Sequence, residues 1–174
     1  MLDCGKIKTH HFLINGNPMD GALIDTNIII DILRSYRHSR PKNEEFKYNF
    51  KSSLAFLDKL FEEETPRYIS CHTLKELLQY PHISKEEEDR ILNIIPSLFE
   101  ILPTTQEISY NAGLLARQSA DYKDYHIEDC YIAATAITLK LKLYTRNPAD
   151  FKYVPHKDLQ IIVPYQYIRD HFSK

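Results

Sequence analysis

Short apolar runs alternate with amphipathic stretches along most of the chain. Five runs rich in Ile, Leu, Val and Tyr are predicted strands: the start of 22–33, and 67–70, 99–102, 142–145 and 160–163. Stretches in which apolar residues recur at helical spacing are predicted helices: the remainder of 22–33, and 52–64, 73–80, 84–95, 105–120 and 127–141. This alternation predicts an α/β fold in which a mostly parallel sheet is covered by helices on both faces.

Polar residues indicate where several helices begin. Thr26 and Asn27 follow the first strand and are good helix N-caps, and Ser84 with Glu87 three residues later fits a capping box. Between the first two helices, 34–51 is predicted to be a basic, aromatic-rich connection interrupted by a proline. Its basic residues are Arg34, Arg37, Arg40, Lys42, Lys47 and Lys51.

Length and composition indicate one folded domain with short additions. The 174 residues are 43% hydrophobic and 26% charged, which argues against extensive disorder. We assign 21–164 to the domain, 1–20 to an N-terminal extension and 165–174 to a C-terminal tail. Because no apolar stretch could span a bilayer and the start lacks a secretory core, we expect a cytoplasmic protein without a membrane partner. Three widely spaced cysteines predict neither disulfides nor structural zinc.

The net charge of −2 lacks the basic excess that often accompanies nucleic-acid binding. A protein that gathers carboxylates in one place masks any basic surface in this total, so local charge is more informative. In 34–51, basic residues are interleaved with aromatic residues, which favours contact with a single nucleic-acid strand through phosphates and stacked bases. The alternative is a solvated loop, because Glu44 and Glu45 lie in the same segment.

Acidic residues follow the predicted strands. Asp25 ends the first strand, Glu76 lies in the helix after the second, Asp129 begins the Ala-rich helix, and Asp150 follows the fourth strand. Because ligands of parallel sheets collect beyond the carboxyl ends of the strands, these acids can converge at one edge. Carboxylates suit Mg²⁺, and such ions assist phosphodiester hydrolysis. Taken singly, each acid fits a blander reading as a helix cap, a dipole partner, a solvated residue or a turn residue.

Three strings occur in an order that resembles the PIN-domain family. They are Ile24–Ile28 (IDTNI), Ile127–Ala136 (IEDCYIAATA) and Tyr144–Phe151 (YTRNPADF), and Ser70–Leu77 (SCHTLKEL) is similar to the family's second acidic motif. The resemblance covers about residues 22–163, and the pattern is most similar to VapC-like toxin ribonucleases. It implies a PIN-like α/β/α sandwich, a Mg²⁺ or Mn²⁺ pocket, cleavage of RNA and, for toxins, an antitoxin partner.

By position, the resemblance makes Asp25, Glu76 and Asp129 the metal-binding acids. The fourth position is open between Asp150 and Asn147, and we favour Asp150. Together these residues predict a metal-dependent endoribonuclease. A non-catalytic PIN-fold RNA-binding or scaffold protein and a metal-dependent phosphatase are the alternatives.

Several neighbours are candidate supporting residues. Thr26 and Asn27 fit roles in orienting Asp25 or a metal-bound water, although helix capping explains them equally well. Arg146 fits a phosphate contact or, as an alternative, an ordinary surface ion pair. Because PIN relatives often dimerise, a homodimer is a further expectation.

Overall fold

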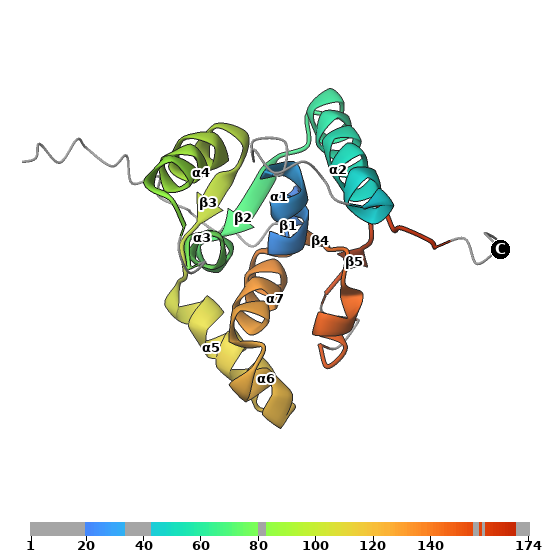
Figure 1. The fold of residues 1–174 in the computed structure, drawn as a ribbon. Coiled ribbons are helices and arrows are strands. Elements are labelled where there is room, and N and C mark those ends of the chain that lie inside the picture. Colours follow the sequence, from blue (N-terminus) through green and yellow to red (C-terminus); the bar gives the residue numbers. More distant parts are fainter. Residues whose placement is uncertain (1–19, 34–42, 80–82, 155–156, 158, 170–174) are drawn as a thin grey trace, which may run out of the picture.

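A five-stranded parallel sheet lies at the centre of the described part of the chain (Figure 1). The structure is a computed structural model that describes residues 20–33, 43–79, 83–154, 157 and 159–169. The strands are β1 (Ala22–Ile24), β2 (Arg67–Ser70), β3 (Glu100–Leu102), β4 (Lys142–Tyr144) and β5 (Ile161–Ile162). Their order is β3-β2-β1-β4-β5, and every neighbouring pair is parallel. The predicted fold class is confirmed, with β1 in the middle.

Helices cover the sheet in two layers (Figure 1). They are α1 (Thr26–Leu33), α2 (Glu44–Glu62), α3 (Cys71–Leu78), α4 (Lys85–Leu98), α5 (Gln106–Ala116), α6 (Ala120–Asp124) and α7 (Ile127–Leu139), and the 3₁₀ helix η2 (Pro148–Phe151) follows β4. Side chains of β1 alternate between two cores: Leu23 packs with α5, α6 and α7, whereas Ala22 and Ile24 pack with α1 to α4. This alternation follows from the two-residue repeat of a strand.

Helix α2 corrects the predicted connection at 34–51. The helix begins at Glu44 rather than at 52, because the Asn43 side chain accepts a hydrogen bond from the Phe46 amide at 2.8 Å and caps it. Lys47 and Lys51 therefore lie on a helix. The rest of the predicted connection, 34–42, lies outside the described residues.

Other helix boundaries also differ from the prediction. The predicted helix 84–95 ends before Pro96, but α4 includes Pro96 and continues to Leu98. The proline is the third residue from the end of the helix and is exposed, so the hydrogen bond it removes and the distortion it causes are confined to the last turn. The predicted helix 105–120 ends at Ala116, and α6 begins after Ser119, whose hydroxyl caps the Asp121 amide at 3.1 Å.

The predicted tail begins with a core residue. Tyr165 is buried and packs with α1 and α2, and its hydroxyl donates to Asp31 of α1 at 3.0 Å. The boundaries of the extension and the tail stay predictions. Within the described ranges, no helix is long and apolar enough to cross a membrane.

Candidate active site

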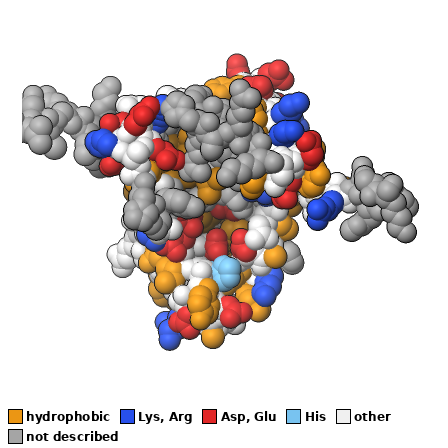
Figure 2. All heavy atoms as spheres, in the orientation of Figure 1, with side chains coloured by type: hydrophobic (Ala, Val, Ile, Leu, Met, Phe, Trp, Pro, Cys, Tyr) orange, Lys and Arg blue, Asp and Glu red, His pale blue; other side chains and the backbone are white. Residues whose placement is uncertain are grey.

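Three candidate carboxylates follow the carboxyl ends of strands, and a fourth lies at the start of a helix. Asp25 comes directly after β1, Glu76 lies in α3 after β2, Asp129 is in the first turn of α7, and Asp150 lies in η2 after β4. In Figure 2, acidic side chains gather near the middle of the visible face, where α1, α3 and α7 meet. The parallel topology therefore brings acids that are far apart in sequence to one edge of the sheet.

Asp25 is the most deeply buried of these acids, with 3% of its surface exposed. One carboxylate oxygen accepts from the Thr26 amide at 2.7 Å. The other accepts from the Asn27 side-chain amide at 2.5 Å and from the Thr145 hydroxyl at 2.7 Å. Three donors thus fix both oxygens, two of them from the start of α1 and one from the end of β4.

Asn27 joins α1 to the loop after β4. Its side-chain amide also reaches the Thr145 hydroxyl at 2.9 Å, and its carbonyl oxygen accepts from the Arg146 amide at 3.0 Å. The Thr145 hydroxyl accepts in turn from the Asn147 amide at 3.0 Å. These bonds hold the loop between β4 and Asp150 against Asn27 at the start of α1.

Glu76 is tied to the same helix start. Its carboxylate accepts a short hydrogen bond from the Thr26 hydroxyl, across the contact between α1 and α3. Thr26 therefore supports two acids, Asp25 through its backbone and Glu76 through its side chain.

Asp129 has a histidine partner. The His126 Nδ1 atom lies 2.7 Å from one Asp129 carboxylate oxygen, and the side chains are 34% and 19% exposed. On the rim, Lys75 and Glu128 form an ion pair that joins α3 to α7. Each member of this pair immediately precedes one of the acids, Glu76 and Asp129.

At the fourth position, Asn147 and Asp150 bind one another. The Asn147 side-chain amide donates to an Asp150 carboxylate oxygen at 2.8 Å. The Asp150 carboxylate also contributes to the electrostatic field at Asp25 and Asp129. Both candidates thus lie together, and the choice of Asp150 for the fourth position stays a prediction.

Arg146 does not point its Nε atom toward the acids. It pairs with Asp31 of α1 at 2.6 Å, and Asp31 is fully buried. Removing one partner of a buried ion pair leaves an uncompensated charge, so this contact supports the fold around the site. The predicted phosphate contact of Arg146 stays a prediction.

Burial and mutual repulsion raise the pKa of three acids. Desolvation is the largest cause for each, and the pKa of Asp25 and that of Asp129 are both raised to about 6. Asp129 and Asp150 contribute to the rise at Asp25, and Asp150 and Glu76 contribute to the rise at Asp129. The pKa of Glu76 is raised by burial and then by Asp25. The pKa of each of these three residues is therefore raised in part by at least one of the other acids.

Sequence reasoning missed three residues that contact the acids: Thr145, His126 and Tyr122. Thr145 belongs to the recognised string at 144–151, where its position just after a strand was the available signal. The Tyr122 hydroxyl donates to the Asp150 carbonyl at 2.5 Å. No pattern in the sequence points to Tyr122 or His126, since neither is spaced like a ligand pair.

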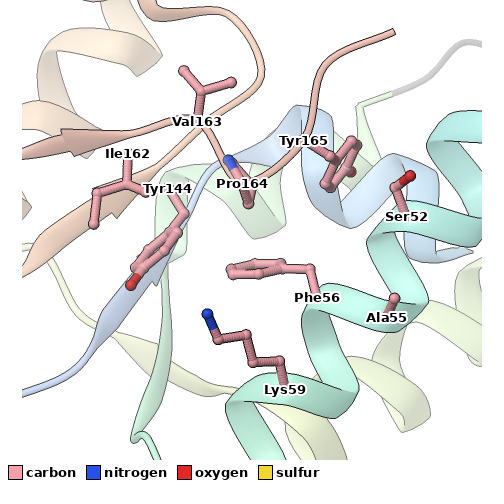
Figure 3. Close-up of a pocket in the computed structure, with 9 residues that line it drawn as sticks. All are labelled: Ser52, Ala55, Phe56, Lys59, Tyr144, Ile162, Val163, Pro164 and Tyr165. Atoms are coloured by element: carbon pink, nitrogen blue, oxygen red, sulfur yellow. The ribbon is translucent and has the colours of Figure 1, made fainter.

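A separate groove of about 610 Å³ lies between α2 and the segment after β5 (Figure 3). Phe56 and Lys59 extend from α2 toward Tyr144 and Pro164. The rings of Phe56 and Tyr144 are 5.1 Å apart. None of the four acids lines this groove, so it is distinct from the acidic edge.

Comparison with known proteins decides the family. The family model of the PIN domain matches residues 22–157. The chain belongs to the PIN-domain family. A search of curated proteins finds no significant match.

Solved structures share the fold of this PIN domain. A chain of FitAcB from Neisseria gonorrhoeae is 22% identical with a TM-score of 0.57, and the match covers 84% of this chain and 99% of that one. A chain of a toxin–antitoxin complex from Klebsiella pneumoniae is 26% identical with a TM-score of 0.55, covering 84% and 100%. A chain of VapBC2 from Rickettsia felis, bound to a promoter DNA fragment, is 21% identical with a TM-score of 0.55, covering 82% and 98%. The predicted similarity to VapC-like PIN domains is confirmed.

The donor set of this PIN domain suits a hard divalent cation. All four acids supply oxygen, and the raised pKa values of Asp25, Glu76 and Asp129 mean that a bound cation would relieve repulsion among these carboxylates. Within the described residues, no group of three His, Cys, Asp or Glu side chains stands close enough to hold one ion together. Mg²⁺ usually takes one or two carboxylates and completes its coordination shell with water, so a Mg²⁺ site does not require three protein ligands in direct contact with the ion.

The raised pKa values predict a pH dependence of stability in metal-free buffer. Asp25 and Asp129 have a pKa of about 6 in the folded chain against a usual 3.8, so their protonation stabilises the fold. That stabilisation is complete below about pH 3.8 and is lost as the pH rises through about 6. We expect the free energy of unfolding, measured with denaturant and a chelator, to fall over this range.

The variant Asp129→Asn should lose less stability over the same range, by a difference on the order of 2 kcal/mol. Asp58→Asn, at an exposed position of α2, is the matched control and should keep the wild-type profile. Equal pH profiles for wild type and Asp129→Asn would show that Asp129 does not have a raised pKa.

Proposed function

We propose that this PIN domain is a Mg²⁺- or Mn²⁺-dependent endoribonuclease in which Asp25, Glu76, Asp129 and Asp150 position metal and water. The observation that carries the proposal is the electrostatic coupling of these four carboxylates at one sheet edge. Buried like charges destabilise a fold, so a structure that gathers them without a basic partner for each is expected to serve a ligand.

Asp25 and Asp129 are the proposed direct metal ligands, joined by Glu76. A bound Mg²⁺ or Mn²⁺ would polarise the scissile phosphate and lower the pKa of the attacking water. Thr26, Asn27 and Thr145 orient Asp25, and Thr26 also orients Glu76. Asn147 orients Asp150, whose carboxylate is the proposed acceptor for a hydrogen bond from the attacking water.

RNA is the proposed substrate, and the cytoplasm is the proposed site of action. Family membership supports a nuclease, and Lys75, which is half-exposed and pairs with Glu128, places a cation beside the acids where a phosphate could approach. The alternative is a non-catalytic RNA-binding or scaffold domain. One observation favours it: among the described residues, no three His, Cys, Asp or Glu side chains are close enough to bind one metal ion together.

A toxin role is proposed from the structural relatives. The Klebsiella pneumoniae structure is described as a toxin–antitoxin complex, and its match extends over all of that chain. We therefore propose an antitoxin as the protein partner of this PIN domain. A homodimer is a further proposal, supported by family membership alone.

Asp25→Asn should abolish cleavage of RNA. The substitution removes the charge from the buried ligand while keeping its shape, so Mn²⁺-stimulated cleavage should fall by about 100-fold or more. Cleavage of a labelled single-stranded RNA by purified wild type, Asp25→Asn and the exposed control Asp58→Asn is the measurement. Undiminished, chelator-sensitive cleavage by Asp25→Asn would overturn the assignment.

Two parallel assays separate the alternatives. A thermal shift with Mn²⁺ but no cleavage by the wild type would favour the scaffold, because a bound ion stabilises the folded state whether or not chemistry follows. Hydrolysis of a chromogenic phosphomonoester in preference to RNA would favour the phosphatase.

Expression of the wild-type chain in a bacterial host should arrest growth if the domain is a toxin. Asp25→Asn should permit growth, since the arrest depends on cleavage, whereas Asp58→Asn should remain toxic. Growth curves after induction, with immunoblots to match expression, provide the measurement. A protein encoded beside this chain that restores growth would identify the antitoxin, and equal growth of all three strains would contradict the toxin role.

A further inference from the structure

Tyr122 of α6 is a buried aromatic residue whose hydroxyl forms two hydrogen bonds. It is 2% exposed. Its hydroxyl donates to the Asp150 carbonyl at 2.5 Å and accepts from the Tyr153 amide at 3.3 Å. These two bonds hold both ends of the short segment that carries the Asp150 side chain.

The ring of Tyr122 contacts a second part of the site. It meets the His126 ring edge-on at 5.7 Å and the Tyr153 ring at 5.0 Å. His126 in turn binds the Asp129 carboxylate at 2.7 Å. One side chain thus touches the backbone of Asp150 and the residue that orients Asp129.

The charge environment agrees with this placement. The pKa of Tyr122 is raised to about 12, mainly by burial, with smaller contributions from Cys130, Asp129 and Asp150, so the phenol lies within the field of both acids and stays a donor.

We propose that Tyr122 is a positioning residue that sets the distance between Asp129 and Asp150. Its hydroxyl fixes η2 and its ring fixes His126. This inference rests on the proposed function, because the spacing of these acids matters for holding a metal ion. The added role belongs to a residue that hydrogen-bonds to neither carboxylate and acts through the Asp150 backbone and through His126.

The variant Tyr122→Phe separates positioning from packing. It keeps the ring in contact with His126 and removes only the hydroxyl oxygen, with its hydrogen bonds to the Asp150 carbonyl and the Tyr153 amide. Because these two groups lose their partner, the variant should fold with a lowered Tm. Tyr110→Phe is the matched control. It removes the same hydroxyl from a tyrosine of α5 that is 64% exposed.

Mn²⁺ binding followed by electron paramagnetic resonance is the first readout. Removing residues that orient ligands typically weakens metal binding by about 10–100-fold, so we expect the dissociation constant of Tyr122→Phe to rise by about tenfold. RNA cleavage should then require more Mn²⁺ for half-maximal rate, with kcat at saturating Mn²⁺ close to wild type. Tyr110→Phe should match wild type in both.

Combination with Asp150→Asn is the second readout. If Tyr122 acts through Asp150, then Tyr122→Phe should weaken Mn²⁺ binding less in the Asp150→Asn background than in wild type, because effects of coupled residues do not add. Full additivity would overturn the proposal, as would wild-type Mn²⁺ affinity or a failure to fold in Tyr122→Phe.

The two proposals fail in different ways. If the wild type binds Mn²⁺ and cuts RNA and Tyr122→Phe does so equally, only the role of Tyr122 is overturned. If the wild type binds Mn²⁺ without cutting RNA, the proposed function fails, and the Mn²⁺ titration still decides the role of Tyr122. A wild type that does neither overturns both.

Discussion

The buried carboxylate of Asp25, at the end of the central strand, is the constraint on which the rest of the site depends. A carboxylate that is 3% exposed is costly unless donors surround it. Those donors come from the start of α1 and from Thr145 after β4, so the acid is satisfied only when β4 pairs with β1. The same pairing places the loop that carries Asp150 beside it. The register of β1 with β4 therefore determines both the centre of the sheet and the placement of the candidate site residues.

Much of this arrangement could be predicted from the pattern of the chain. The second strand, Arg67–Ser70, agrees with the prediction to the residue, and Ser84 caps its helix as expected. Because the sheet is parallel, Asp25 and Asp150, which follow strands, must lie at one edge, and the electrostatic influence of Asp129 on Asp25 places the start of α7 near them. Local signals succeed where a single turn or cap decides the structure.

The rest depends on contacts between distant residues. Thr145 is 120 residues from Asp25, and only the register of β1 with β4 brings its hydroxyl within 2.7 Å. The start of α2 was misplaced because the charged residues after Asn43 resemble a loop, although the cap and an acidic first turn favour a helix. Tyr122 and His126 have no spacing that distinguishes them from ordinary core and helix-start residues. Their relation to the acids exists only after α6 packs on α7.

The proposed grouping of these carboxylates into one divalent-metal site can be tested by locating bound metal directly. A crystal of the wild-type protein would be soaked with Mn²⁺ and diffraction recorded at the Mn absorption edge. We expect an anomalous peak within coordination distance of Asp25 or Asp129, with Glu76 and Asp150 reaching it directly or through water, and no such peak in Asp25→Asn. A peak only elsewhere, or none at saturating Mn²⁺, would show that these carboxylates do not form a metal site.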